Sequence, residues 1–300
     1  MNIFSRRQNP GLRVSFEFFP PSNERISKTL WATLDRLAPL SPDFISVTYG
    51  AGGTTRERTL ETVRRVASES GVPVAGHLTC VSASKAESDR AIAAYALAGV
   101  RRIVALRGDP AEGVGHRYVA RPDGYANAAE LTAAIARQGD FEIYVSAYPE
   151  KHPESPDFAT DIDMLKRKAD AGASRAITQF FFDNDSYEAY VERVRRAGIY
   201  IPVIPGILPV HDFAKVASFA ARCGAHVPAW LAQRFEGLEN DPQTRALVAA
   251  AVAAEQVTDL MERGITDFHF YTMNRAELAF AICHLIGLRP NRESSLARAS

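Results

Sequence analysis

Glu17 is the residue of this sequence whose setting is hardest to explain by folding alone. It lies in the strand-like segment Val-Ser-Phe-Glu-Phe-Phe-Pro-Pro at positions 14–21, among aromatic side chains and before two prolines. Removal from water disfavours the charged form of a carboxyl group, so acids are rare in buried strands. Either Glu17 points to solvent, or it lies at the mouth of a buried sheet as a proton donor. The first alternative is the commoner one for an isolated strand acid, so the other strands decide the matter.

Two further stretches carry groups that suit a polar ligand. Arg107 and Asp109 flank a glycine directly after an apolar run. The guanidinium offers a planar fork for phosphate, and a local surface ion pair is the alternative interpretation. Gln179 precedes three phenylalanines at 180–182. An amide beside an aromatic wall suits a flat heterocycle, with core packing as the alternative for the rings. The glycine-rich segment 50–53 would let the backbone approach a phosphate.

The histidines and cysteines do not show the spacing of a metal site. Three cysteines stand far apart without a CxxC pair, which indicates buried thiols in a reducing compartment: Cys80, Cys223 and Cys283. Three histidines on strand or loop segments lack a metal-binding spacing: His77, His152 and His269. We therefore expect no metal, and we expect each histidine to be satisfied within the fold or bonded to a ligand.

The composition is that of a globular chain with a large core. Hydrophobic residues make up 46% and charged residues 23% of the 300 positions. The 35 basic and 35 acidic residues cancel, which argues against a nucleic-acid-binding protein. No apolar run approaches the roughly 18 residues of a membrane span, and residues 1–11 lack an apolar signal core. We expect a cytoplasmic protein that binds neither nucleic acid nor membrane.

Eight strand-like runs recur along the chain, separated by segments with helical periodicity. The runs are near-continuously apolar, as expected of parallel strands covered by helices: 13–19, 43–49, 72–79, 102–107, 142–148, 175–182, 201–208 and 267–272. Spacings of three and four mark the helices, as in Ile26, Leu30, Leu34 and Leu37. Glycine, which ends helices by adopting the left-handed conformation, precedes five of the strands: Gly71, Gly99, Gly172, Gly198 and Gly264.

This alternation predicts an α/β fold, a (β/α)8 TIM barrel formed by one domain over residues 1–300. A doubly wound open sheet would place a GxGxxG loop after its first strand, where this chain has Phe-Phe-Pro-Pro. The segment 228–264 is too long for a single connector. We therefore expect extra helices before the last strand, one of them over 241–263.

Barrels of this kind gather their chemistry at the carboxyl ends of the strands. Most of the eight runs end in, or are followed by, a side chain able to hydrogen-bond a polar ligand: Glu17, Thr48, His77, Arg107, Tyr148, Gln179 and Tyr271. Random strand ends would carry mixed turn residues. This convergence favours a real site and places Glu17 within it.

Nine short blocks occur here in the order that they take in bacterial methylenetetrahydrofolate reductases, which this chain resembles from residue 14 to residue 290. They are FEFFPP, SVTYGA, HLTC, ALRGD, AYPEKHPE, LKRKADAGA, AITQFFFD, PGILPV and DFHFYTMNRAE. The resemblance implies a barrel that binds FAD without a Rossmann motif. It implies reduction of 5,10-methylenetetrahydrofolate to 5-methyltetrahydrofolate with NADH or NADPH, by ping-pong hydride transfer through the flavin. It also implies a homo-oligomer that serves one-carbon metabolism and methionine biosynthesis.

The resemblance also implies roles for particular residues. Two positions are implied to be catalytic: Glu17 as the general acid that protonates N10 of the folate, and Asp109 as a charge that tunes the isoalloxazine. The implied folate-binding positions are Glu17, Gln179, Phe219, Tyr271 and Arg275. The implied FAD contacts are Thr48, His77, Arg107, Gly108, Asp109, Tyr125, Ala147, Tyr148, His152, Asp161 and Lys168.

Three other functions remain to be weighed. The same enzyme could work physiologically as a 5-methyltetrahydrofolate oxidase, because the same residues serve both directions. An inactive flavin- or folate-binding barrel would have no need of an acid at Glu17. A barrel aldolase or isomerase acting on sugar phosphates would want a Schiff-base lysine or a base at a strand end, and no lysine lies at any of the eight ends.

Overall fold

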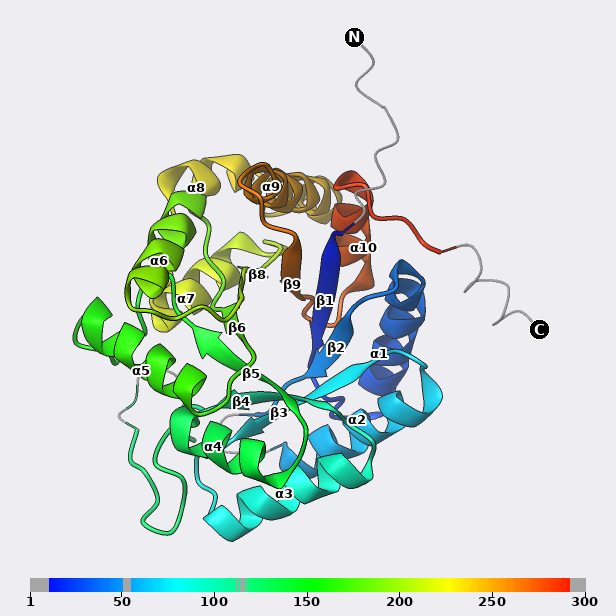
Figure 1. Cartoon of the computed structure of the whole chain (residues 1–300). Coiled ribbons are helices and arrows are strands. Elements are labelled where there is room, and N and C mark those ends of the chain that lie inside the picture. Colours follow the sequence, from blue (N-terminus) through cyan, green and yellow to red (C-terminus); the bar gives the residue numbers. More distant parts are fainter. Residues whose placement is uncertain (1–10, 51–54, 112, 114–115, 117, 292–300) are drawn as a thin grey trace.

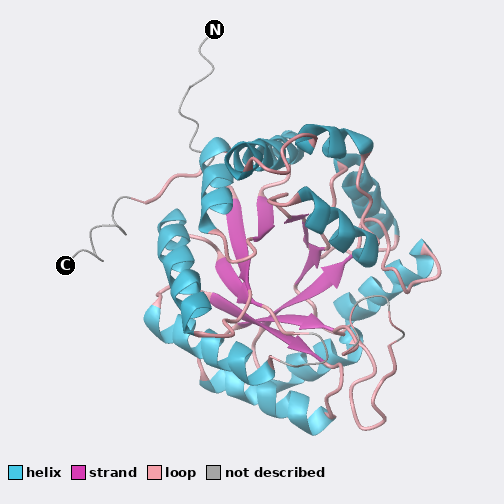
Figure 2. Ribbon diagram, turned by 180° about the vertical axis from the view of Figure 1, so that it is seen from behind, coloured by secondary structure: helices cyan, strands magenta, loops and turns pink. Residues whose placement is uncertain are grey.

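The computed structural model, which describes residues 11–50, 55–111, 113, 116 and 118–291, is a ring of parallel strands surrounded by helices (Figures 1 and 2). The strands are β1 (Arg13–Phe18), β2 (Phe44–Val47), β3 (Val74–Thr79), β4 (Arg102–Leu106), β5 (Glu142–Ala147), β6 (Arg175–Thr178), β7 (Val203–Ile204), β8 (Gly206–Ile207) and β9 (Asp267–Tyr271). The predicted (β/α)8 barrel is confirmed. Apart from Gly50, the segment 50–53 that was expected to approach a phosphate lies outside the described residues.

The helices follow the strands around the outside of the barrel. They are α1 (Glu24–Leu37), α2 (Arg56–Glu69), α3 (Lys85–Leu97), α4 (Ala128–Gln138), α5 (Phe158–Asp170), α6 (Asn184–Arg196), α7 (Phe213–Cys223), α8 (Ala229–Phe235), α9 (Pro242–Glu262) and α10 (Ala276–Leu285), with the short 3-10 helix η1 (Ala38–Leu40) after α1. The extra helices expected before the last strand are therefore α8 and α9. Within the described ranges, no helix combines the length and the apolar character that crossing a bilayer requires.

The barrel closes through a segment that changes its pairing partner at Pro205. The sheet order is β7-β6-β5-β4-β3-β2-β1-β9-β8, so β7 pairs with β6 while β8 pairs with β9. Proline has no backbone N–H and interrupts a hydrogen-bond ladder. The single strand predicted over 201–208 is for this reason two strands of two residues each. Together they fill one place in the ring.

Helix α1 shows how the sequence specifies the connecting helices. The side chain of Asn23 caps the helix by accepting a hydrogen bond from the backbone N–H of Ile26 at 2.9 Å. Leu30, Leu34 and Leu37 turn one face into the core and are almost fully buried. Each such leucine contributes about 2 kcal/mol by leaving water. The five glycines expected to end helices all have left-handed φ angles, between 68° and 110°.

Apolar side chains form a core on each side of the sheet. Outward-facing residues such as Phe16 and Phe18 belong to the large cluster between strands and helices. Inward-facing residues form a second, smaller cluster inside the barrel: Phe44, Ala75, Val104, Tyr144, Ile177 and Ile204. Because successive strand residues face opposite sides, the parity of a position along its strand decides which core it joins.

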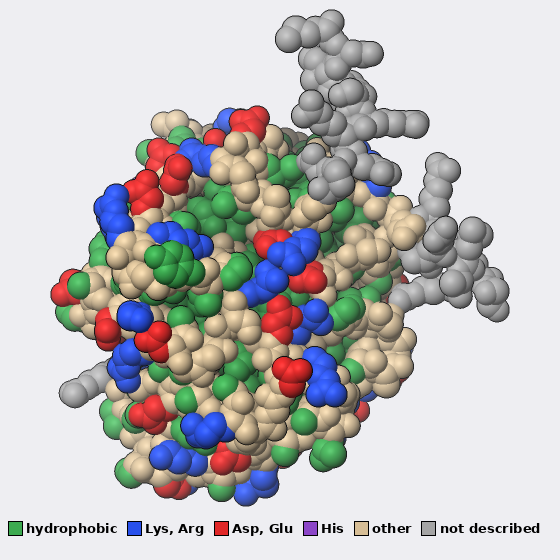
Figure 3. Space-filling model, in the orientation of Figure 1, with side chains coloured by type: hydrophobic (Ala, Val, Ile, Leu, Met, Phe, Trp, Pro, Cys, Tyr) green, Lys and Arg blue, Asp and Glu red, His purple; other side chains and the backbone are tan. Residues whose placement is uncertain are grey.

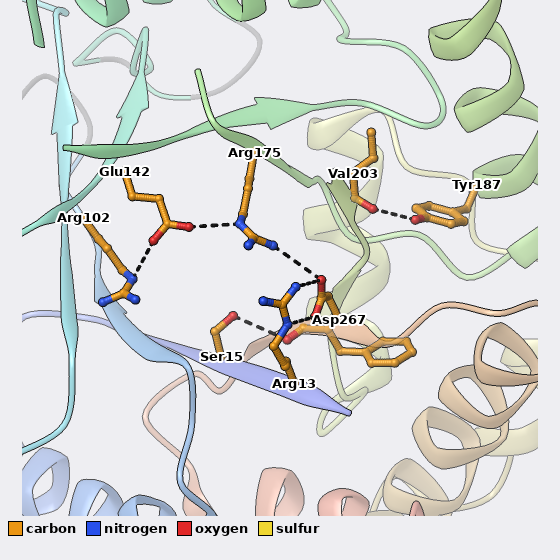
Figure 4. Close-up of polar contacts among 9 residues, drawn as sticks. Arg13, Ser15, Arg102, Glu142, Arg175, Tyr187, Val203 and Asp267 are labelled. Atoms are coloured by element: carbon orange, nitrogen blue, oxygen red, sulfur yellow. Dashed lines mark hydrogen bonds and ion pairs between the residues drawn. The ribbon is translucent and has the colours of Figure 1, made fainter. Parts of the chain in front are cut away.

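Charged side chains close the amino-terminal end of the barrel. They are the first residues of β1, β4, β5, β6 and β9, and they form a chain of ion pairs (Figure 4): Arg13, Arg102, Glu142, Arg175 and Asp267. Arg175 lies 3.0 Å from Glu142 and 3.5 Å from Asp267, which joins β5 to β9 across the barrel. In Figure 3, charges of both signs lie near the middle of the molecular face. These ion-paired side chains therefore fill the amino-terminal end of the barrel.

Candidate active site

A cavity of about 760 Å³ lies at the carboxyl ends of the strands. This volume is typical of sites for small molecules. Most of the residues that the sequence singled out line it: Glu17, Thr48, His77, Arg107, Gly108, Asp109, Tyr148, His152, Asp161, Lys168, Gln179, Phe219 and Tyr271. These side chains come from strand ends and from the helices that follow them. The structure thus brings together residues that are spread over more than two hundred positions of the chain.

Glu17 is held at the inner wall of the cavity by the pairing of β1 with β9. Its backbone carbonyl accepts a hydrogen bond from the hydroxyl of Thr272 at 2.6 Å. Its carboxyl group is largely buried, with 15% of the side chain exposed. The Oε2 atom lies 3.4 Å from Nε2 of His77 and 3.6 Å from Nε2 of His269. Glu17 therefore lies inside the barrel mouth, and the solvent-facing alternative is excluded.

The two histidines beside Glu17 are buried and incompletely bonded. Neither Nε2 atom has a hydrogen-bond partner among the described residues. Burial lowers the pKa of His77 to about 4, although the neighbouring carboxylate of Glu17 opposes that shift. His77 is consequently neutral near pH 7 and carries one ring proton.

The turn after β4 brings backbone and charge to the cavity. Gly108 has a φ of +83°, and an added Cβ would lie 2.6 Å from Cγ1 of Val81 and 2.8 Å from Cβ of Thr79. Only glycine fits there without strain. Arg107 gives both terminal nitrogens to the carboxylate of Glu154, at 2.9 and 2.6 Å. Desolvation raises the pKa of the Asp109 carboxyl group, against the attraction of Arg107.

The region after β5 supplies a second group of titratable side chains. The rings of Tyr148 and His152 meet edge to face at 4.7 Å. Burial lowers the pKa of His152 to about 4, with Arg107 adding to the shift. Lys168 is 4% exposed and donates to the carbonyl of Ser146 at 2.5 Å. Burial lowers its pKa to about 8, while Asp161 opposes the shift.

Aromatic rings and an amide form another part of the cavity wall. Phe219 of α7 stacks on Phe180, with ring centroids 5.4 Å apart, and 36% of Phe219 remains exposed. Gln179 accepts a hydrogen bond from the backbone N–H of Phe180 at 3.1 Å, which leaves its amide NH₂ available. The hydroxyl of Tyr271 donates to the carbonyl of Thr178 at 2.6 Å. A planar ligand with hydrogen-bonding edges suits this wall.

Three of the singled-out residues lie outside the cavity lining. The hydroxyl of Tyr125 donates to Asp89 at 2.8 Å, and Lys85 lies over its ring. Ala147 is buried, and its carbonyl accepts from the N–H of Gln179 at 2.8 Å. Arg275 is the residue before α10. Burial lowers the pKa of His211, and the nearby charge of Arg275 lowers it further.

Three residues that matter to the site were not expected there from the sequence. Ser15 lies behind Glu17, Glu154 occupies the fork of Arg107, and Cys223 lines the cavity with a thiol whose pKa burial raises to about 12. Ser15 was recognisable, because it is two positions before Glu17 on the same strand and so faces the same way. Among the described residues, no group of three or more His, Cys, Asp or Glu side chains is placed to hold a metal ion.

Comparison with known proteins identifies the family. The family model described as methylenetetrahydrofolate reductase matches residues 4–287. The chain belongs to the methylenetetrahydrofolate reductase family. It is 47% identical over 281 residues to the 5,10-methylenetetrahydrofolate reductase of Pectobacterium carotovorum subsp. carotovorum, which covers 93% of this chain and 92% of that protein. The Escherichia coli (strain K12) reductase is also 47% identical, over 279 residues, with the same coverage.

A more distant relative shares the family, and a solved structure shares the fold. Methylenetetrahydrofolate reductase (NADH) 1 of Arabidopsis thaliana is 34% identical and covers 95% of this chain, which matches 50% of that longer protein. An uncharacterized protein from Clostridium thermocellum, described as binding two copies of 5-methyl-5,6,7,8-tetrahydrofolic acid, has a TM-score of 0.62. It is 14% identical and covers 92% of this chain and 94% of its own, so it shows the fold alone. Membership of the reductase family supports an oxidoreductase that reduces methylenetetrahydrofolate.

Proposed function

We propose that this protein is an FAD-dependent reductase that converts 5,10-methylenetetrahydrofolate to 5-methyltetrahydrofolate with a reduced nicotinamide cofactor. The observation that carries the proposal is the placement of Glu17, Asp109 and Gln179 in one cavity of a chain that belongs to the reductase family. A general acid, a charge beside the redox group and an amide for the pterin are the functional parts that this reaction needs.

The residues at the cavity fit a flavin. Gly108 allows backbone to approach a ligand, since a Cβ there would meet Val81 and Thr79. His77 has an unpartnered Nε2 within the lining, and Arg107, Lys168 and His152 provide groups for phosphate and ribose oxygens. The remaining implied contacts are Thr48, Asp109, Tyr148 and Asp161, with Tyr125 and Ala147 further back. A bound flavin would accept hydride from the nicotinamide and pass it to the folate, the two substrates using one place in turn.

The side chains around the folate would prepare it for hydride. Glu17 gives its proton to N10, which opens the five-membered ring and leaves an electrophilic iminium at N5. Gln179 binds the pterin by its free amide. Phe219 covers the ring system, Tyr271 borders the inner wall, and Arg275 is available to a carboxylate beyond the rim. The desolvated site strengthens each of these polar contacts.

Half-reactions of the flavin test this proposal. Purified protein should be yellow and should bleach anaerobically on addition of NADH or NADPH. Addition of 5,10-methylenetetrahydrofolate to the bleached protein should restore the colour and yield 5-methyltetrahydrofolate. Protein that stays colourless after incubation with FAD would refute the cofactor assignment. Bleaching without reoxidation by folate would refute the substrate.

The reverse reaction is the second candidate, because the same residues serve oxidation of 5-methyltetrahydrofolate. Bleaching of the flavin by 5-methyltetrahydrofolate, compared with bleaching by each nicotinamide, distinguishes the two directions. A barrel that only binds flavin or folate would show neither half-reaction. We further propose that the protein is cytoplasmic and forms a homo-oligomer. Sedimentation of the purified protein tests the oligomeric state.

A further inference from the structure

Polar pairs run along the inner face of the barrel where β1 meets β9. The register places Arg13 opposite Asp267, Ser15 opposite His269, and Glu17 opposite Tyr271. All of these residues share the strand parity that faces the interior. The three pairs therefore form a polar seam that leads from the amino-terminal ion pairs to the cavity.

The middle pair of this seam lies in a layer that is otherwise apolar. The inner cluster around it consists of residues such as Phe44, Val104 and Ile177, and the ring of Phe44 stacks on His269 at 5.9 Å. The His269 side chain is 1% exposed, and Ser15 is 3% exposed. Burial of polar groups costs free energy unless they are bonded, so this pair calls for an explanation that packing does not give.

The contacts of Ser15 bear on which ring nitrogen of His269 carries the proton. The Ser15 hydroxyl lies 2.7 Å from Nδ1 of His269 and 3.4 Å from the carbonyl of Phe268. A serine has one proton to donate, and the shorter contact is much the stronger. We assign that proton to the Nδ1 contact, with Nδ1 as the acceptor. In that arrangement the ring proton of His269 lies on Nε2, the nitrogen that faces Oε2 of Glu17.

We propose that His269, with its tautomer set by Ser15, is a positioning residue that orients the carboxyl group of Glu17 for proton transfer. The Nε2–H of His269 donates to Oε2, and the acidic proton is left on Oε1. The 3.6 Å separation closes to a hydrogen bond when substrate tightens the site, as catalytic contacts commonly do. After the proton has moved to N10, the same donor stabilises the carboxylate.

The other groups that face Glu17 are consistent with this assignment. Nε2 of His77 on β3 approaches the same oxygen, Oε2, at 3.4 Å, so both imidazoles lie on one side of the carboxyl group. The hydroxyl of Tyr271 on β9 is engaged with Thr178 and is not available as a donor to Glu17. Arg13, the next inward charge on β1, is paired with Asp267. Among the described residues, the ring nitrogens of His77 and His269 lie within ion-pair distance of the Glu17 carboxyl group.

Two substitutions at one position separate orientation from packing. His269→Gln places an amide nitrogen near the position of Nε2, where it still donates to Glu17. His269→Asn places its amide near Nδ1, where it contacts Ser15 but falls short of Glu17. Both keep a polar side chain of similar bulk. The inference rests on the proposed function, so the readouts are the two flavin half-reactions, their pH dependence, and the tautomer of His269 itself.

The Asn variant should keep flavin reduction by the nicotinamide and lose about ten- to a hundredfold in the folate half-reaction. The pH above which that half-reaction slows should move upward, because the carboxylate has lost a donor. The Gln variant should recover most of the rate and return the pH profile. Equal losses in both variants, or an unmoved profile, would overturn the proposal.

Nitrogen NMR of ring-labelled histidine gives a readout that needs no turnover. The His269 signal, assigned by its loss in His269→Gln, should report Nε2–H in the unsubstituted protein and a shift toward Nδ1–H in Ser15→Ala. An Nδ1–H tautomer in the unsubstituted protein would refute the inference even where both half-reactions proceed. A protein with the expected tautomer but without the half-reactions would instead refute the proposed function.

Discussion

Arg107 and Glu154 form a two-pronged ion pair in the cavity wall, with nitrogen-to-oxygen distances of 2.9 and 2.6 Å. The sequence suggested that the fork of Arg107 binds phosphate, and in the structure a carboxylate already occupies it. A flavin phosphate would have to share this arginine or displace Glu154. The affinity for flavin therefore includes the cost of disturbing an existing ion pair.

Glu154→Gln should for this reason bind FAD more tightly, with a dissociation constant lower by about three- to tenfold, the effect of roughly 1 kcal/mol. Loss of the competing charge frees Arg107 without removing it. Fluorescence quenching of FAD on titration with flavin-free protein measures the change, and Arg107→Gln serves as the control that should weaken binding. Weaker binding by Glu154→Gln would show that Glu154 holds Arg107 in its binding position.

Glu17→Gln should separate the two half-reactions. Glutamine keeps the size and polarity of the side chain but cannot supply a proton, so folate reduction should fall by at least about a hundredfold. Flavin reduction by the nicotinamide requires no proton from this residue and should persist. Stopped-flow measurement of each half-reaction checks the outcome. Equal loss of both would mean that Glu17 serves binding or stability instead.

Gly108→Ala should lower both stability and flavin content. The substitution combines a left-handed φ of +83° with a Cβ only 2.6 Å from Val81, at a cost of about 2 kcal/mol or more. Gly99→Ala is the matched control, because Gly99 has a φ of +75° but open space around its Cβ. Chemical denaturation of the flavin-free proteins should rank Gly108→Ala below Gly99→Ala. Equal stabilities would mean that the neighbours yield without strain.

Acid should destabilise the flavin-free protein through His77. Its pKa is about 4 in the folded chain against an ordinary value of 6.5, so the unfolded chain binds more protons between these values. Above pH 6.5 His77 is neutral in both the folded and the unfolded chain and has no effect on stability. As the pH falls through 4, the unfolded chain gains its proton first, and the free energy of unfolding drops by about 3 kcal/mol. The free energy of unfolding, measured across this range, should fall less steeply in His77→Gln. Parallel pH profiles would contradict the burial of a neutral His77.

The repeated alternation of apolar runs and helices was enough to predict the barrel and to locate most of the residues that line its cavity. The helix face of Leu30, Leu34 and Leu37 and the glycine joints follow from local rules, so they were predictable. Pro205 was visible in the sequence, but the change of pairing partner there was not. It depends on β6 and β9, which lie on either side of this segment only in the closed barrel. The pairing of Arg107 with Glu154 likewise depends on the path of the loop between β5 and α5, which brings Glu154 to the end of β4. Ser15 and His269 were predictable neighbours of Glu17. Alternate residues of a strand face the same side, so both side chains point into the barrel as Glu17 does.

The pairing of β1 with β9 also has a consequence for the order in which the protein folds. The other neighbouring strands are close in sequence, whereas Ser15 and His269 are separated by 254 residues. Closing so long a loop costs about 5 kcal/mol of chain entropy before any contact repays it. A refolding chain should therefore assemble its helices and most of its sheet first and join its two ends last. Since the carboxyl group of Glu17 rests on that final junction, refolding molecules should regain helical circular dichroism before they regain the ability to transfer hydride to folate.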